Sequence, residues 1–193
     1  MAKKVIGVTG GLATGKTTVV DMFVAKGAVK IDADVVSHRL LLEDEDIKRK
    51  VTKVFGDDIV VNGEIDRRKL AEKVFFDKEG LEYLDRILHP AIIGRIKEEI
   101  KRNKDKVVVL DAPLLVETDL QDIVDIVVVV FCDHETQIKR AADRGISEHE
   151  AKSIIAMQMP MTEKVKFADF TIDNSNEEMK AAKEGVDKIW QKT

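Results

Sequence analysis

Residues 8–18 read VTGGLATGKTT, and this stretch decides the fold. It matches the pattern G-x-x-x-x-G-K-[ST] from Gly10 to Thr17, in which glycines let backbone N–H groups turn inward around phosphate oxygens. An apolar run comes before the loop and a helical pattern follows it, which is the context that the pattern requires. The positive end of the following helix dipole adds to the attraction for phosphate. The stretch therefore predicts a nucleoside triphosphate site between a strand and a helix.

Two side chains of this loop have expected partners on a bound nucleotide. Lys16 would reach the β- and γ-phosphates of ATP, and the hydroxyl of Thr17 would bind Mg²⁺. We expect the loop backbone to supply further phosphate contacts. The predicted ATP-binding loop consists of Gly10, Gly11, Leu12, Ala13, Thr14, Gly15, Lys16, Thr17 and Thr18.

Apolar, β-branched runs predict the strands of an α/β domain. The hydrophobicity within each run is continuous rather than alternating, which is typical of parallel strands covered on both faces. A helical pattern opens at the loop and stops at Gly27, and its alternation with the strands predicts a doubly wound sheet. The runs cover residues 3–9, 28–32, 106–111 and 125–131, with a weaker fifth run at 169–173.

A helical insertion is predicted after the second strand, because the third strand begins much farther along the chain than the ~12 residues that a crossover needs. Residues 44–104 are charge-rich and helical in pattern, with one helix starting at the cap Asp66 and another at Pro90. His89 would then mark a bend between two helices. The Asn-Gly pair at 62–63 stands between apolar residues and predicts a hairpin turn.

A second pair of helices is expected after the fourth strand, over residues 134–160. Gly145 can end the first helix, while Ser147 with Glu150 fits a capping box at the start of the second. A helical hairpin at the carboxyl end of a sheet is placed where a mobile lid would be. Residues 1–193 are thus interpreted as one domain that carries an insertion and a lid.

Acidic residues at strand ends are candidates for the chemistry of phosphate transfer. Asp32 and Asp34 lie in the segment DAD, at the edge where ligands collect in open α/β sheets. Asp34 would serve as a helix N-cap and Asp32 has no obvious capping role, so Asp32 is the preferred base. Asp111 closes the run VVVLD and would hold the metal directly or through water. Glu117 either faces the same cleft or is a solvated loop carboxylate.

Two arginines stand four positions apart in the predicted lid. If Arg140 and Arg144 share one helix, they share a face, as two guanidinium groups must if both close on phosphates. There they would neutralise charge in the transition state. The alternative is a solvated basic end of a helix, favoured by the helix dipole.

Composition limits the partners and the location. The chain has 193 residues, and 32 basic against 36 acidic side chains give a net charge of −4, so no nucleic-acid-binding surface is expected. The first apolar run is too short for a signal peptide or a membrane span, which places the protein in the cytoplasm.

Cys132 is the single cysteine and cannot form an intramolecular disulfide. Its apolar neighbours predict a buried structural thiol.

Taken together, these segments resemble the dephospho-CoA kinase family over almost the whole chain. Very many proteins share the loop, but the ordered set that includes DAD, LHP and DAPLL is specific. The resemblance implies a P-loop kinase fold with a five-stranded parallel sheet, and ATP-dependent phosphorylation of the ribose 3′-hydroxyl of dephospho-CoA. The matching segments are IGVTGGLATGKTTV, DADVVSHRLL, FGDDIVVNGEIDRRKLAEKVF, LHPAI, VVLDAPLLVET, KRAADRG and QMPMTEKVKFADFTIDNS.

The same resemblance implies roles for residues at the acceptor site. Asp32 would be the catalytic carboxylate, and the helical insertion would bind the acceptor. The residues expected along the acceptor cleft are Arg67, His89 and Leu114.

For the nucleotide, the resemblance implies that Arg140 and Arg144 contact ATP and that Asn174 lies near the adenine. The chain departs from the family at one point. Family members often carry an arginine four residues before the glutamine that matches Gln158, and this chain has Ile154 there. A phosphate contact at that position is therefore not expected.

Two other functions are compatible with the loop. Another small-molecule P-loop kinase, such as a nucleoside monophosphate or shikimate kinase, would share the loop and the lid but differ in the insertion. A GTP-binding switch would share the loop alone. Guanine-specific switches carry an N-K-x-D segment after a late strand, and the sequence has no such segment.

Overall fold

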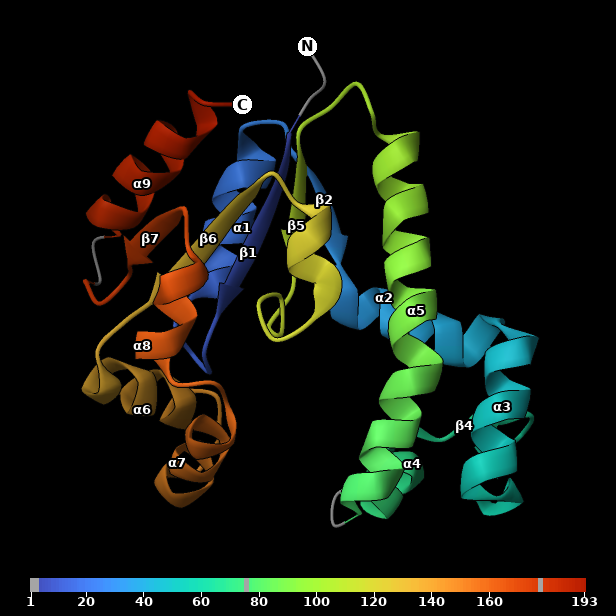
Figure 1. The fold of residues 1–193 in the computed structure, drawn as a ribbon. Helices are drawn as coiled ribbons and strands as arrows, with labels where there is room; N and C mark the ends of the chain where they lie inside the picture. The colour runs from blue at the N-terminus through green and yellow to red at the C-terminus, as the bar shows by residue number, and fades with distance from the viewer. Residues whose placement is uncertain (1–3, 75–76, 177–178) are drawn as a thin grey trace. The chain divides into compact units, whose positions relative to one another are not determined.

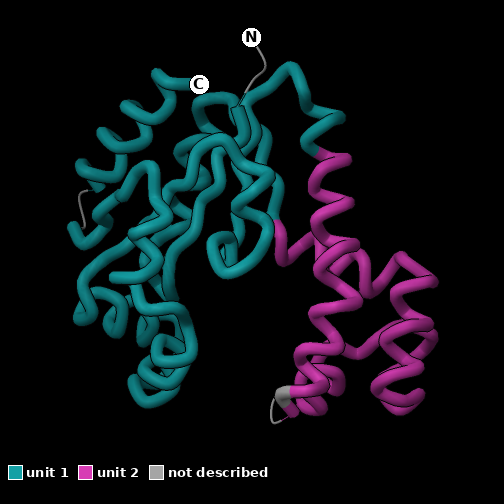
Figure 2. The backbone as a smooth tube through the Cα atoms, in the orientation of Figure 1, with its two compact units in different colours: residues 1–32, 100–193 teal, residues 33–99 magenta. Residues whose placement is uncertain are grey.

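The computed structural model describes residues 4–74, 77–176 and 179–193. The chain forms two compact units, which Figure 2 shows in different colours. Residues 1–32 and 100–193 form the first, here called the sheet unit, and residues 33–99 form the second, the helical unit. Each unit has a hydrophobic core of its own.

A five-stranded parallel sheet runs through the sheet unit (Figure 1). Its strand order is β2-β5-β1-β6-β7, so each of the five predicted apolar runs forms a strand and the predicted parallel sheet is confirmed. Parallel strands end at the same edge, which brings the carboxyl ends of β1, β2 and β5 together. The strands are β1 (Val5–Gly10), β2 (Val29–Asp32), β5 (Val108–Asp111), β6 (Ile126–Phe131) and β7 (Phe170–Asp173).

Helices α1 and α9 pack against each other and against one face of this sheet (Figure 1). Phe23 of α1 and Ile189 of α9 are fully buried in the core they share with β1, and each buried side chain of this kind stabilises the fold by about 1.5–3 kcal/mol. The helices of the unit are α1 (Lys16–Ala25), η2 (Asp119–Ile123), α6 (His134–Ala142), α7 (Glu148–Met157), α8 (Met161–Lys164), η3 (Val165–Phe167) and α9 (Lys180–Trp190).

The turn residues singled out in the sequence end and begin helices as expected. Gly27 follows α1 at φ +104°, and Gly145 follows α6 at φ +80°, a region that glycine enters without steric cost. Ser147 is the N-cap of α7, since its hydroxyl accepts the N–H of Glu150 at 3.2 Å. The helix ends at Gly27 and Gly145 and the N-cap at Ser147 are confirmed, the last through the bond from the N–H of Glu150.

The helical unit is built mainly from helices around a small apolar core. Ile47, Val51 and Phe55 recur at every fourth position of α3 and are buried together with residues of the neighbouring segments. None of the helices in the described part of the chain is long and apolar enough to cross a membrane. The elements are α2 (Ala33–Glu43), α3 (Glu45–Phe55), η1 (Asp57–Ile59), β3 (Val60–Val61), β4 (Glu64–Ile65), α4 (Arg67–Val74) and α5 (Lys78–Arg102), whose last residues belong to the sheet unit.

Two predictions for the helical unit are confirmed. The strands β3 and β4 pair antiparallel, and the turn residues between them, Asn62 and Gly63, have φ +55° and +84°. Both positive angles are what a tight two-residue hairpin turn requires. Asp66 caps α4, because its carboxylate accepts the N–H of Arg68 at 2.9 Å and of Lys69 at 3.2 Å.

The prediction that a helix starts at Pro90 is wrong, and so is the prediction of a bend at His89. Helix α5 begins at Lys78 and continues through Pro90. A proline inside a helix costs about 3 kcal/mol, because it removes one backbone hydrogen bond and its ring crowds the preceding turn. Leu88 and Ile92, on either side of the proline, both pack into the core of the helical unit, and burying apolar side chains of this kind offsets the cost of the proline.

Candidate active site

The phosphate loop lies between the end of β1 at Gly10 and the start of α1 at Lys16. Ala13 and Gly15 both have positive φ, +55° and +83°, and the hydroxyl of Thr14 donates to the carbonyl of Gly11 at 3.1 Å. A left-handed conformation costs a residue with a β-carbon roughly 1–2 kcal/mol, so the conformation at Ala13 has to be maintained by surrounding contacts.

Three amide side chains from other parts of the sheet unit supply those contacts. Gln158 accepts the N–H of Leu12 at 2.9 Å, and Gln137 donates to the carbonyl of Leu12 at 2.7 Å. Asn174 donates to the carbonyl of Thr14 at 2.9 Å. Sequence reasoning missed Gln137 and Gln158 as loop contacts, because no local pattern marks a glutamine that bonds a residue more than a hundred positions away.

Buried polar atoms of Arg140 and Asn174 have unmet hydrogen-bonding capacity beside this loop. Within residues 4–74, 77–176 and 179–193, neither Arg140 Nη1 nor Asn174 Oδ1 has a hydrogen-bond partner. Both side chains lie next to Gly15, since a β-carbon placed there would lie 3.7 Å from Arg140 Nη1 and would collide with the amide of Asn174. Buried polar groups are normally paired, so these atoms are suited to a polar ligand at the loop.

The expectation that Arg140 and Arg144 share one helix is wrong. Helix α6 ends at Ala142, and Arg144 lies in the following turn, exposed. The N–H groups of Arg144 and Ile146 both return to the carbonyl of Ala141, at 3.0 and 3.1 Å, so Gly145 closes the helix earlier than the spacing suggested. Ile154 is half-buried in α7.

An ion-pair cluster forms where β2 and β5 end side by side. Asp32 and Asp111 are direct partners across these strands. Lys16 contacts one oxygen of Asp111, and Lys30 contacts the other at 3.3 Å as well as Asp32 at 3.1 Å. Two lysines and two carboxylates from three segments of the chain thus lie in one cluster. Lys16 connects this cluster to the phosphate loop.

Lys30 is the member of this cluster that sequence reasoning missed. Burial lowers its pKa, but the hydrogen bond to Asp32 and the charge of Asp111 outweigh that effect, and the net pKa is raised above the usual value for lysine. That Lys30 lies on the same face as Asp32 could have been predicted from the sequence, because side chains two positions apart on a strand point to the same face. Lys30 therefore stays protonated in the cluster.

Asp34 does not take the N-cap position expected for it. Helix α2 begins at Ala33, so Asp34 lies inside the first turn, where an acid is still favoured by the helix dipole. The residue that precedes the helix is Asp32. The capping argument that separated the two aspartates is therefore wrong, although Asp32 remains the one in the cluster with Asp111.

Glu117 is not a solvated loop carboxylate, and its place in the cleft beside Asp111 stays a prediction. It pairs with Lys164 at 2.8 Å, and Lys164 is only 1% exposed. The ammonium group also donates to the carbonyl of Pro113 at 2.9 Å, which accepts the hydroxyl of Thr9 at 2.8 Å. Lys164 therefore joins α8 to the last residues of β1 and to the turn after β5.

The residues expected along an acceptor cleft lie in different units. Arg67 is the exposed first residue of α4, and His89 is half-buried in α5; both belong to the helical unit. Leu114 belongs to the sheet unit, follows β5, and is 54% exposed, which is unusual for a large apolar side chain. Their common role in acceptor binding stays a prediction.

The oxygen atoms near the loop fit a magnesium ion that is shared with a nucleotide. No group of three or more histidine, cysteine or acidic side chains suited to a metal occurs among the described residues. Magnesium typically takes one or two protein oxygens together with substrate phosphates and water, and Thr17 and Asp111 offer a hydroxyl and a carboxylate. The two ammonium groups at Asp111 show that its charge is balanced by cations.

Cys132 is buried, as predicted, and lies close to the loop. Its sulfur is 4.0 Å from the carbonyl oxygen of Ala13. Burial raises the pKa of the thiol, and the nearby charge of Arg140 only partly opposes that rise. The thiol therefore stays protonated and serves as packing beneath the loop.

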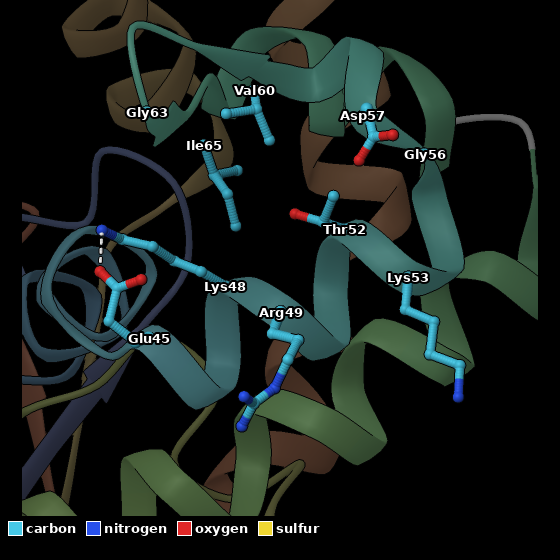
Figure 3. A pocket seen from close by; sticks show the side chains of 10 residues that line it. All are labelled: Glu45, Lys48, Arg49, Thr52, Lys53, Gly56, Asp57, Val60, Gly63 and Ile65. Atoms are coloured by element: carbon cyan, nitrogen blue, oxygen red, sulfur yellow. Dashed lines mark hydrogen bonds and ion pairs between the residues drawn. The ribbon is translucent and has the colours of Figure 1, made fainter.

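A pocket of about 640 Å³ lies within the helical unit (Figure 3). Lys48 and Glu45 pair at its rim, and Thr52 and Ile65 face its interior, whereas Arg49 points away. Its charged residues are mostly exposed side chains of α3. None of the residues predicted for ATP or acceptor binding lines it.

Comparison with known proteins gives consistent matches along most of the chain. The family model for dephospho-CoA kinase matches residues 4–180. A dephospho-CoA kinase of Geobacillus kaustophilus (strain HTA426) is 42% identical over 175 residues, covering 88% of this chain and 87% of the relative.

Two solved structures are also similar. The crystal structure of TT1252 from Thermus thermophilus has a TM-score of 0.86 and 29% identity, covering 100% of this chain and 98% of that one. Dephospho-CoA kinase from Campylobacter jejuni has a TM-score of 0.65 and 28% identity, covering 98% and 97%. Both likenesses extend over the sheet unit and the helical unit.

Proposed function

The chain belongs to the dephospho-CoA kinase family, and from this premise we propose that Asp32 is the base of its phosphoryl transfer. The family transfers the γ-phosphate of ATP to the ribose 3′-hydroxyl of dephospho-CoA, which gives coenzyme A and ADP. The observation that carries the proposal is that Asp32 and Asp111 are direct neighbours on β2 and β5. They lie at the edge of the sheet that also holds the phosphate loop, where Lys16 contacts Asp111.

The proposed role of Asp32 follows from the chemistry of phosphoryl transfer. The acceptor oxygen forms a bond to the γ-phosphorus as the bond from that phosphorus to ADP breaks, and the acceptor hydroxyl must lose its proton. Most of the catalysis comes from positioning and charge neutralisation, so Asp32 orients the hydroxyl and takes its proton late.

The proposed donor site is the loop itself. Its N–H groups and the N-terminus of α1 bind phosphate oxygens, and Lys16 exchanges Asp111 for the β- and γ-phosphates. Arg140 Nη1 and Asn174 Oδ1 are buried donors and acceptors beside Gly15, which supports a nucleotide at this position. We include Arg140 and Asn174 in the ATP site on this ground, whereas Arg144 rests on the family resemblance alone.

Thr17 and Asp111 are the residues proposed to hold Mg²⁺. When bound, the ion would neutralise negative charge that develops on the phosphate oxygens.

The helical unit, with Arg67 and His89, is proposed to bind the acceptor together with Leu114. Residues 134–160 are proposed to act as a lid. A cytoplasmic location also stays a proposal, which cell fractionation tests.

The decisive experiment compares Asp32→Asn with Asp34→Asn in an ADP-release assay with Mg·ATP and dephospho-CoA. Asp32→Asn keeps the shape of the side chain and removes its charge, so we expect turnover to fall by about 10²- to 10⁴-fold while calorimetry shows unchanged ATP binding. Asp34→Asn should retain turnover. If the two variants exchange these results, Asp34 is the base, and if AMP or shikimate is a better acceptor, the substrate assignment is wrong.

A further inference from the structure

Lys30 contacts both carboxylates of the ion-pair cluster, although its side chain is part-exposed. It lies on β2 two positions before Asp32, and its ammonium nitrogen is 3.1 Å from Asp32 Oδ2 and 3.3 Å from Asp111 Oδ2. The oxygen of Asp111 that Lys30 does not contact is the one that faces Lys16. The two lysines therefore divide the two oxygens of Asp111 between them.

The register of the sheet favours a cation between the two carboxylates. Asp32 and Asp111 are direct partners in β2 and β5, and neighbouring strands lie only about 4.8 Å apart. Like charges directly opposite each other on a sheet repel and destabilise it. Removing the ammonium group restores this repulsion, so Asp32 is expected to shift away from Asp111.

Lys16 and Lys30 differ in what they can do once a nucleotide is bound. Lys16 belongs to the phosphate loop and is expected to move to the phosphates, which frees one oxygen of Asp111. Lys30 belongs to a strand, and its alternation with Asp32 along β2 keeps both side chains on one face. The bridge between Asp32 and Asp111 can therefore persist when Lys16 leaves.

We propose that Lys30 is a positioning residue for phosphoryl transfer, whose ammonium group holds Asp32 beside Asp111 and so directs Asp32 toward the acceptor hydroxyl. The proposal rests on the role of Asp32 proposed above. Lys30 does not contact the reacting atoms and acts through Asp32, so its removal lowers kcat and leaves the affinity for nucleotide unchanged.

The test uses Lys30→Met, which keeps the length of the side chain and removes its charge, and Lys30→Arg, whose planar guanidinium group can bridge two carboxylates. Lys26→Met is the matched control, because Lys26 has the same 32% side-chain exposure and pairs with Asp187, at the opposite end of α1 from the loop. We expect kcat to fall about 10- to 100-fold in Lys30→Met, as for a misplaced catalytic group. Lys30→Arg should recover most of it, and Lys26→Met should match the wild type.

Combination with Asp32→Asn separates positioning from a general loss of structure. Asp32→Asn removes the charge that Lys30 is proposed to position, so Lys30→Met should not lower kcat further in that background, although it still removes the ion pair of Lys30 with Asp111. ADP affinity measured by calorimetry should be the same in all variants. A kcat of Lys30→Met within twofold of wild type, or a loss that multiplies with that of Asp32→Asn, overturns the proposal for Lys30. An active Asp32→Asn variant instead overturns the proposed base.

Discussion

Two lysine–carboxylate pairs of the sheet unit and one pair of the helical unit differ in how far apart their partners lie along the chain and in how deeply they are buried. In the sheet unit Lys16 pairs with Asp111, 95 positions away, and Lys164, whose side chain is 2% exposed, pairs with Glu117, whose side chain is 18% exposed. In the helical unit Lys48 pairs with Glu45 three positions away, and Glu45 is 83% exposed. The same chemical groups therefore join distant segments in the first two pairs and lie on an exposed helix surface in the third, and the loss of one partner costs more in a buried pair than in an exposed one.

Breaking the pair of Lys164 and Glu117 should produce the largest loss of stability. Lys164→Met or Glu117→Gln alone leaves the other charge buried and should lower the free energy of unfolding by about 3–5 kcal/mol. The double variant should lose less than the sum of the two. Urea unfolding followed by circular dichroism measures all three, and a change below about 1 kcal/mol in Lys164→Met would show that the pair behaves as a surface pair.

Two glycines with nearly equal backbone angles, one in each unit, test how far the surroundings of a residue decide the effect of adding a β-carbon. Gly15 and Gly63 have φ +83° and +84°, but a β-carbon at Gly15 would collide with Asn174, whereas one at Gly63 would meet nothing within 4 Å. Both alanine variants pay roughly 1–2 kcal/mol for the left-handed conformation. Only Gly15→Ala should also weaken ADP binding, by at least about tenfold, since the loop must shift away from Asn174.

Calorimetric titration with ADP distinguishes the two glycine variants directly. Equal ADP affinity in Gly15→Ala and Gly63→Ala would mean that the contact of Asn174 with the loop does not shape the nucleotide site.

The smallest effect is expected at the pocket of the helical unit. Lys48→Met removes an i, i+3 pair whose acid is solvated, so the free energy of unfolding should change by less than about 1 kcal/mol. The same measurement in 1 M salt should show no difference between variant and wild type, because salt screens such pairs. A loss as large as that in Lys164→Met would remove the distinction between the buried pair and the exposed pair.

Local patterns were sufficient for most of the fold. The five strands, the hairpin at Asn62 and the caps at Asp66 and Ser147 were all predicted, since each depends on the chemistry of a few consecutive residues. The errors concern the boundaries of helices. Helix α5 runs through Pro90, α6 stops before Arg144, and α2 begins before Asp34, and the exact ends of a helix are what local patterns specify least.

The sequence by itself determined the phosphate loop, the parallel sheet and the family, because glycine spacing, hydrophobic runs and ordered motifs are written in consecutive residues. Only the tertiary structure decided which side chains meet at the site. Lys30 reaches Asp111, Gln158 holds Leu12, and Lys164 is buried against Glu117 because parallel strands and the turns after them bring distant segments to one edge. Ion pairs and hydrogen bonds depend on distances of about 3 Å, which no spacing along the chain specifies.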